Sequence, residues 1–315
     1  MLKLIASRLG QGVITLFAVS VLIFICTQIL PGDVASAVLG QGATPEALAA
    51  FRKELGLNEP AYMRYFNWLW GAIQGDLGVS MTNQRVIIDE LLPRLYNTLF
   101  LAGYAALIAI PLSVGLGILA AINEGKLVDK ASNILTLITI SIPEFFIAYL
   151  MIIFFVVELG WFPSLATVYP GIEFGERVYI TTLPAVALTM LVAAHMLRMT
   201  RSSVLSVMSS PYIEMAFLKG AKRTRVISRH ALPNAAAPII TVIALNLAYL
   251  VVGVVVLEAV FVYPGIGQLM VDAVSKRDVP VIQACGLVFA MVFVVLNTLA
   301  DVAIILVNPR LRHKR

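Results

Sequence analysis

Charged and catalytic side chains are scarce in this sequence of 315 residues. Only 13% of the residues are charged, three are histidines and two are cysteines, whereas 60% are hydrophobic. A soluble domain is about 45–50% apolar, so this composition, with a mean hydropathy of +0.91, indicates an integral membrane protein. Cys26 and Cys285 both fall within or beside apolar runs, and we therefore expect neither a disulfide nor a metal site.

The sequence also lacks the motifs of nucleotide chemistry. In the pair Gly125-Lys126, the lysine is followed by Leu127, and Ala120 stands where a phosphate-binding loop needs its first glycine. No set of nucleophile and base stands out, and no cluster of metal ligands does. We therefore expect no enzyme activity, no catalytic residue and no cofactor bound by this chain.

Long apolar runs alternate with polar segments, as expected for helices that cross a membrane. They predict an all-α protein with six transmembrane helices, at about 9–30, 96–121, 132–157, 181–200, 235–262 and 282–306. Pro111 and Pro143 should kink the second and third of these helices. Ala35-Ser36-Ala37 is similar to a signal-peptide cleavage site, but the first run exceeds the roughly 7–15 residues of a signal-peptide core. We interpret residues 1–30 as an uncleaved span.

Residues 31–95 are too polar to span a membrane and predict a small helical extracytoplasmic subdomain. Thr44-Pro45-Glu46 has the pattern of a helix start, with Leu48, Phe51 and Leu55 on one face. Pro60 begins a second helix, which is rich in aromatic residues, and Val86–Leu95 predicts a third. We expect the aromatic side chains to pack on the membrane bundle.

Basic residues predict the topology, because they are enriched in cytoplasmic loops. The net charge of +5 therefore indicates membrane topology rather than nucleic-acid binding. We expect both termini, the basic tail at 307–315 and the loop at 201–233 to be cytoplasmic. With this orientation the cytoplasm holds 15 of the 23 lysines and arginines: Lys3, Arg8, Lys126, Lys130, Arg198, Arg201, Lys219, Lys222, Arg223, Arg225, Arg229, Arg310, Arg312, Lys314 and Arg315.

The segment Ser209–Pro233 joins two apolar runs, and its first half predicts a helix over 211–221. Pro211 suits the first helical position, Ser209 or Ser210 can cap it, and Gly220 breaks it. A solvated loop rarely carries so many apolar side chains. Such a helix either docks into a groove of a partner or lies on the membrane surface, and the physical argument alone leaves both open. The apolar residues are Tyr212, Ile213, Met215, Ala216, Phe217 and Leu218.

Within this loop, Glu214-Met215-Ala216 is followed by Gly220 and then by Leu232-Pro233. This spacing resembles the EAA loop of bacterial ABC importer permeases. Met215 stands where the motif has its first alanine. His230 stands where it usually has isoleucine, and the peptide-type branch of the family often carries histidine there. The same branch is matched by Leu30-Pro31-Gly32-Asp33, Leu55-Gly56-Leu57, Gly75-Asp76-Leu77-Gly78, Tyr263-Pro264-Gly265-Ile266-Gly267-Gln268 and Arg277-Asp278-Val279-Pro280, with Val34 departing from its usual proline.

This resemblance covers nearly the whole chain and implies a permease subunit of a type I ABC importer in the dipeptide, oligopeptide and nickel family. Residues 96–306 would form the permease core, with the coupling loop at 201–233. In that family the loop helix sits in a cleft of an ATPase subunit. The coupling residues implied are Tyr212, Glu214, Met215, Ala216, Phe217, Lys219 and Gly220.

The resemblance also implies partners and a place in the cell. The partners are a homologous second permease subunit, two cytoplasmic ATP-binding subunits that carry ATP and magnesium, and an extracytoplasmic solute-binding protein. The chain would lie in the lipid bilayer of the bacterial cytoplasmic (inner) membrane. Peptides are the expected substrate, although nickel chelates and glutathione share this architecture.

Three acidic residues fall within predicted spans, where a charge costs roughly 2.5–3.5 kcal/mol on insertion scales. Glu144 either lines a water-filled path that attracts cationic ammonium groups or is satisfied by backbone freed at the Pro143 kink. Glu258, near the outer end of the fifth span, is a candidate for the outer gate. Asp301 should pair with a basic residue at the inner rim.

The alternative function is a secondary transporter or channel without ATPase partners. It would need a coupling-ion site or broken helices in matching halves of the chain, and the sequence shows neither convincingly.

Overall fold

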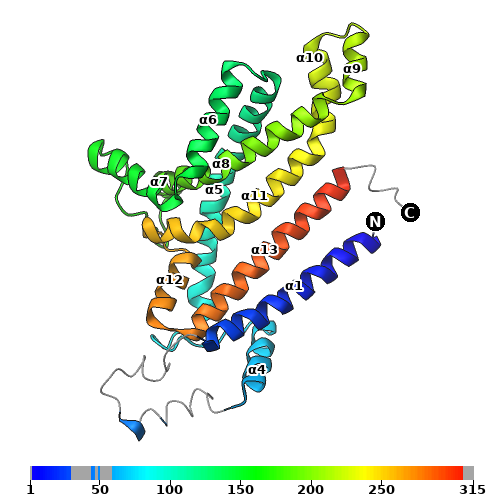
Figure 1. Ribbon diagram of the computed structural model, residues 1–315. Coiled ribbons are helices and arrows are strands. Elements are labelled where there is room, and N and C mark those ends of the chain that lie inside the picture. The colour runs from blue at the N-terminus through cyan, green and yellow to red at the C-terminus, as the bar shows by residue number, and fades with distance from the viewer. Residues whose placement is uncertain (1, 30–43, 47–48, 50–58, 308–315) are drawn as a thin grey trace.

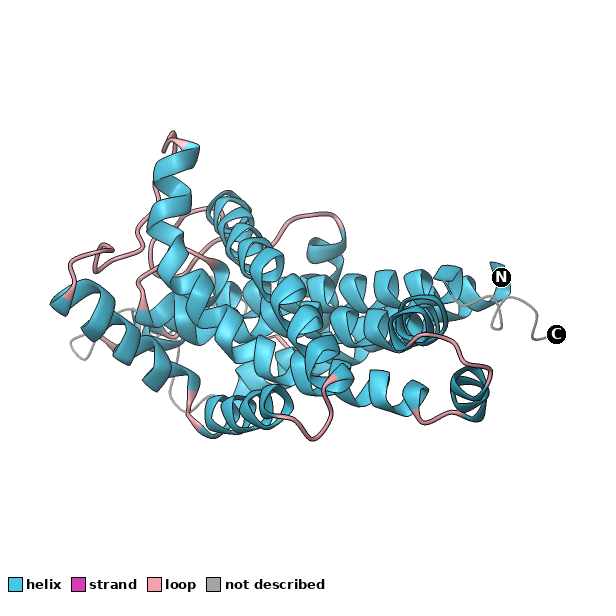
Figure 2. Ribbon diagram, turned by 90° about the horizontal axis from the view of Figure 1, so that it is seen from above, coloured by secondary structure: helices cyan, strands magenta, loops and turns pink. Residues whose placement is uncertain are grey.

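A computed structural model of the chain describes residues 2–29, 44–46, 49 and 59–307. Helices joined by loops make up this part of the chain (Figure 2), which confirms the predicted all-α fold. Five of the described helices are long and apolar enough to cross a membrane. They are α1 (Leu2–Ile29), α5 (Ile87–Ile122), α8 (Phe174–Met208), α11 (Leu232–Val260) and α13 (Val279–Val307).

The remaining predicted span is broken rather than kinked. α6 (Leu127–Ser141) ends before Pro143, and α7 (Glu144–Met151) then leaves at 100°, continued by a π-helical segment, η1 (Ile152–Glu158). Ile142 has an extended backbone, which a residue before proline prefers. By contrast, α5 continues through Pro93 and Pro111. The described residues therefore form five continuous candidate spans and a sixth that is bent.

The core lies where α5, α8 and α11 meet. α5 and α8 form the most extensive contact between any two helices described, and α11 packs on α8 and α13. Small residues let these helices approach closely, as is usual in membrane bundles. A Cβ atom added to Gly117 of α5 would lie 2.8 Å from Cβ of Thr200 on α8, which is closer than side chains tolerate. α1 packs against α13 at the edge of the bundle (Figure 1).

The segment between the first two long helices is only partly as predicted. α4 (Ala61–Ile73) packs on α1, where the hydroxyls of Tyr65 and Ser20 are 2.8 Å apart and the ring of Phe24 contacts Tyr65 edge-on. This contact confirms that an aromatic residue of the segment packs on the bundle. Val86–Leu95 is not a separate helix, because α5 begins at Ile87 and runs on without interruption. Leu48, Phe51 and Leu55 lie outside the described residues.

Short helices lie at the two ends of the long ones (Figure 1). α9 (Pro211–Leu218), α10 (Arg223–Val226) and a π-helical segment, η2 (Ile227–Ala231), lie at one end, together with the loop from α5 to α6, the start of α1 and the end of α13. α4 and α12 (Ile266–Lys276) lie at the other end. The fold thus places the predicted coupling loop far from the segment at 59–86.

Candidate coupling surface and membrane path

α9 is held to the rest of the chain by one deeply buried side chain. Ile213 is fully buried against Val226 and Ala231, which belong to α10 and η2. Val207 and Met208, at the end of α8, pack on the same cluster. α10, η2 and α11 follow one another without a loop. α9 is therefore supported by the ends of two membrane helices, α8 and α11.

The residues at the start of α9 are those that the sequence predicts, but the predicted capping hydrogen bond is not formed. Pro211 occupies the first turn and Ser210 is the N-cap residue, with an extended backbone. Its hydroxyl, however, donates to the carbonyl of Val207 instead of capping a backbone N–H of α9. The hydroxyl thus ties the helix to the end of α8.

The end of α9 depends on Gly220. The helix stops at Leu218 rather than at the predicted residue 221, and Gly220 has a φ of +75°. The N–H of Gly220 donates to the carbonyl of Phe217 (2.9 Å), and the N–H of Ala221 donates to that of Ala216 (3.2 Å). This is the Schellman arrangement, in which glycine adopts the left-handed conformation that other residues disfavour. A Cβ on Gly220 would meet no atom of this chain.

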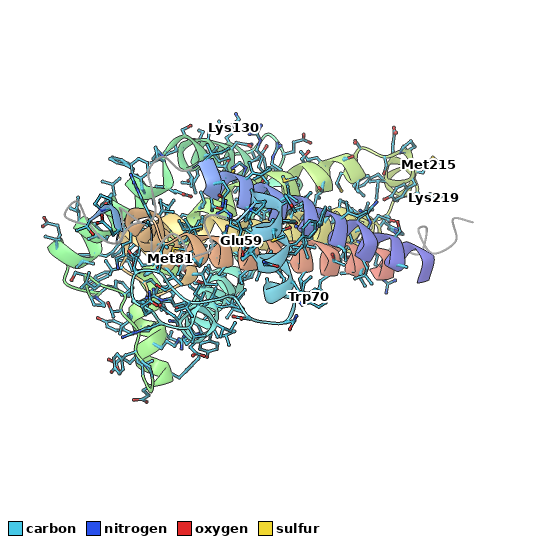
Figure 3. The ribbon with its side chains drawn as sticks, turned by 90° about the horizontal axis from the view of Figure 1, so that it is seen from below. Glu59, Trp70, Met81, Lys130, Met215 and Lys219 are labelled. Carbon is cyan, nitrogen blue, oxygen red and sulfur yellow. The ribbon has the colours of Figure 1, made fainter. Side chains whose placement is uncertain are left out.

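The structure divides the predicted coupling residues into two groups. Tyr212, Glu214, Met215, Phe217, Lys219 and Gly220 are exposed. Met215 and Lys219 lie close together, on the side of the molecule away from Met81 (Figure 3). Ala216 is half-buried against the Ile213 cluster, so it supports the helix rather than the surface.

Two apolar residues of α9, Ile213 and Leu218, were not among the predicted coupling residues. Leu218 has the most exposed apolar side chain of the helix, at 75%, whereas Ile213 is 0% exposed. Ile213 and Ala216 are three residues apart and so share a face of the helix, which is a signal that the sequence does contain. The exposed apolar surface that α9 presents consists of Tyr212, Met215, Phe217 and Leu218.

Glu144 lies at the corner of the bent third span. It is the first residue of α7, directly after Pro143, and its side chain is half-buried. A carboxylate at this position is favoured by the partial positive charge of the helix N-terminus. The two alternatives for Glu144, a path-lining group or an acid satisfied at the break, therefore both remain predictions.

Glu258 is part of the core and is inaccessible in this structure. Its side chain is 0% exposed and accepts hydrogen bonds from the hydroxyl of Thr98 (2.7 Å) and from the backbone N–H groups of Gly267 (2.7 Å) and Gln268 (3.2 Å). The carboxylate fills the space beside Gly265, where a Cβ would lie 2.0 Å from Oε1. Glu258 therefore does not line an open path here but fastens the start of α12 to α5 and α11.

A second buried acid fastens the other end of α12. Asp278 accepts hydrogen bonds from the hydroxyls of Ser80 (2.5 Å) and Thr82 (2.8 Å) and from the backbone N–H groups of Met81 and Thr82. Asp278 belongs to one of the motifs on which the family resemblance rests, and Ser80 follows another, Gly75-Asp76-Leu77-Gly78, by two residues. Ser80 and Asp278 are 198 residues apart, and their hydrogen bond joins these two stretches of the chain.

Asp301 forms the ion pair that the sequence predicts. Its carboxylate lies 3.2 Å from the guanidinium of Arg8, and the pair joins α13 to α1 at the α9 end of the molecule. No group of three or more histidine, cysteine, aspartate or glutamate side chains among the described residues is arranged to hold a metal ion.

Comparison with known proteins decides the family. Residues 113–313 match the model of the binding-protein-dependent transport system inner membrane component, and residues 1–102 match the model of the N-terminal part of such membrane components. This chain belongs to that family. It is a permease subunit of an ABC importer and a multi-pass protein of the inner membrane.

Relatives of this permease extend over its whole length. It is 38% identical over 314 residues to the glutathione transport system permease protein GsiC of Escherichia coli O6:H1, with all of both chains covered. The protein of the same name from Shigella dysenteriae serotype 1 is also 38% identical over 314 residues, again with full coverage. Family membership favours the importer over the alternative of a secondary transporter or channel.

The fold of the permease is similar to that of a solved ABC importer. An inward-facing structure of the MetNI methionine ABC transporter gives a TM-score of 0.54 at 18% identity, covering 69% of this chain and 96% of that one. This likeness concerns the fold alone. A permease of such an importer works in general with an ATPase, a binding protein and a second permease.

Proposed function

We propose that this permease moves peptides or peptide-like small solutes from an extracytoplasmic solute-binding protein into the cytoplasm. Two cytoplasmic ATP-binding subunits, which bind ATP and magnesium, drive the transport, and a homologous second permease subunit completes the path. The observation that carries this proposal is the exposed apolar surface of α9, which projects beyond the ends of α8 and α11 (Figure 1). An apolar surface in that place fits a protein partner.

The expected substrate class is supported by the relatives. The two described above are named for the transport of glutathione, which is itself a small peptide. A peptide has a charged amino group, and an acid at the corner of the third span would attract it. Glu144 is therefore the residue of this chain that we propose to line the path.

The proposed orientation has both termini in the cytoplasm. α9, the loop from α5 to α6, the start of α1 and the end of α13 share one end of the molecule (Figure 1). That end carries Lys126, Lys130 and Lys219, all exposed. Basic residues accumulate on the cytoplasmic side of inner-membrane proteins, which supports this assignment.

Cross-linking tests the contact between α9 and an ATPase subunit. Met215→Cys should form a cross-link to an ATPase subunit in the assembled complex, because Met215 is 53% exposed on the α9 surface. Asn83→Cys, exposed at the opposite end, is the matched control and should form none. A cross-link from residue 83 and none from residue 215 would contradict the proposal.

Transport into proteoliposomes tests the substrate and the path together. With its binding protein and ATP, the complex should accumulate glutathione or a dipeptide in preference to a nickel chelate. Glu144→Gln should reduce uptake while leaving subunit assembly and basal ATP hydrolysis unchanged. If the amount of assembled complex falls as much as uptake does, Glu144 is a structural residue instead.

A further inference from the structure

An ion pair joins α6 to α8 near the coupling loop. Arg201 of α8 contacts Asp129 of α6 through two hydrogen bonds, from Nε to Oδ1 (2.5 Å) and from a terminal nitrogen to Oδ2 (2.9 Å). The side chain of Asp129 is 6% exposed and that of Arg201 is 21% exposed. A two-point contact between a guanidinium and a carboxylate fixes orientation as well as distance.

Further hydrogen bonds make Asp129 a junction of three segments. The backbone N–H of Gly125, in the loop after α5, donates to Oδ2 (2.9 Å). The side-chain amide of Asn133, one turn along α6, donates to Oδ1 (3.0 Å). The carboxylate therefore connects the loop after α5, the start of α6 and the end of α8.

α6 packs on α8 and, less extensively, on α5, but few of its side chains are buried there. Among its fifteen residues, all of which the structure describes, only Asp129 and Thr136 are buried. Near Thr136, a cavity of about 140 Å³ separates α6 from α5 and α8, and apolar side chains make up most of its lining. α6 is therefore loosely packed around Thr136 and is attached most firmly at Asp129.

The two helices that Arg201 and Asp129 join lead to functionally different places. Arg201 lies about two helical turns before the end of α8, the helix that leads to α9 and supports it. α6 leads in the other direction to the 100° bend, where Glu144 lies. The ion pair and α6 thus form one connection between α9 and the bend, beside the direct packing of α7 on α8 and α11.

We propose that the Arg201–Asp129 pair is the link through which movement of α9 is transmitted to the bent third span. Both are positioning residues: neither touches the solute or ATP. This inference rests on the proposed docking of an ATPase subunit on α9. Without the pair, α8 would move with α9, and α6 would follow it less closely, because few of its other side chains are buried against α8 and α5.

Activity measurements give the first test. In the complete complex, Asp129→Asn should keep both ATPase subunits and binding-protein-stimulated ATP hydrolysis. The amount of solute transported per ATP should fall roughly tenfold, within the usual range of coupling between sites. Arg201→Lys keeps the charge but loses the two-point contact, so the amount of solute transported per ATP should fall less than in Asp129→Asn. Asp301→Asn breaks the exposed pair with Arg8 (34% and 50% exposed) and is the matched control, which should keep normal coupling.

Distances between spin labels test the inference through the positions of the helices rather than through transport. Cys26 and Cys285 are first replaced by alanine. The distance between labels at Ser206 and Lys130 then reports the position of α8 relative to α6, and the distance between labels at Ser206 and Asn83 reports the position of α8 relative to the opposite end of the molecule. On trapping with ATP, the second distance should change and the first should stay constant. In Asp129→Asn both should change.

Two results would overturn the link. If the distance between residues 206 and 130 changes in the protein that retains Arg201 and Asp129, α6 does not follow α8. If the distance between residues 206 and 83 stays constant, α8 does not move and there is no movement to transmit. Neither result depends on cross-linking at residue 215, whose failure would instead contradict the docking of an ATPase on α9.

Discussion

α9 and α12 are both short helices that lie next to long membrane helices, but the chain holds them in different ways. α12 buries Ile266, Leu269 and Ala273 in a cluster with α5 and α13, and two buried carboxylates fasten its ends. α9 buries Ile213 alone and exposes most of its other side chains. α12 is therefore a fixed part of this chain, whereas α9 keeps an exposed apolar surface, as the proposed docking of an ATPase subunit requires.

The largest effect in this comparison is expected from Glu258→Ala. The substitution leaves the hydroxyl of Thr98 and the N–H groups of Gly267 and Gln268 without their acceptor, and each unpaired buried donor costs roughly 1–3 kcal/mol. The melting temperature of the purified permease should fall clearly. Glu158→Ala removes an exposed carboxylate and is the control. Equal melting temperatures for the two variants would mean that Glu258 does not fasten α12.

A smaller and local effect is expected from Ile213→Ala. Truncating a buried isoleucine costs roughly 2–5 kcal/mol, but here the loss should be confined to α9 and the segment that supports it. Hydrogen–deuterium exchange should become faster over 211–231 and remain unchanged in α12. Leu218→Ala, on the exposed side of the same helix, should leave exchange unaltered. Faster exchange throughout the chain would show that α9 is not a separate unit.

Substitutions of Gly220 separate backbone strain from charge. A left-handed residue other than glycine costs roughly 1–2 kcal/mol, and asparagine and aspartate tolerate that conformation better than most. Gly220→Asn and Gly220→Asp have the same shape, so a difference between them reports the charge. We expect Gly220→Asp to lose ATPase subunits or their stimulation by the binding protein, and Gly220→Asn to retain both. Identical subunit stoichiometry and stimulated ATP hydrolysis would place the contact elsewhere.

Labelling of single cysteines leaves the fold unchanged and tests on which side of the membrane each end of the molecule lies. In a background without Cys26 and Cys285, Asn83→Cys at the α12 end should react with an impermeant thiol reagent in intact cells. Ser206→Cys at the α9 end should react only after the cells are permeabilised. The opposite pattern would invert the proposed orientation.

The apolar runs were sufficient to predict the class of fold and the number of candidate spans, because burial in lipid requires about twenty apolar residues wherever a helix crosses. They did not predict the break at Pro143. Pro93, Pro111, Pro184 and Pro238 all lie inside continuous helices. Whether a helix continues through a proline depends on neighbouring helices that satisfy its freed backbone groups, and a single segment of sequence does not contain that information.

The sequence likewise predicted the local features of the candidate site but not its long-range contacts. The exposed residues of α9 follow from a local pattern, and so does the turn at Gly220. The roles of the buried acids do not, because each depends on a residue far away in the sequence. Thr98 is 160 residues from Glu258, and Asp129 is 72 residues from Arg201. Asp301 was predicted to pair because it lies near the end of a span where basic residues are common.

The attachment of α9 through Ile213 has a consequence for how such importers diversify. A helix of eight residues whose fold depends on one inward side chain and a terminal glycine leaves the rest of its sequence free to change. Under the proposed docking, its outward residues can therefore vary together with the surface of the ATPase subunit without altering the membrane-embedded bundle. Exchange of motor subunits between related transporters then requires changes in a few outward positions of one short helix, and the solute path can be inherited intact.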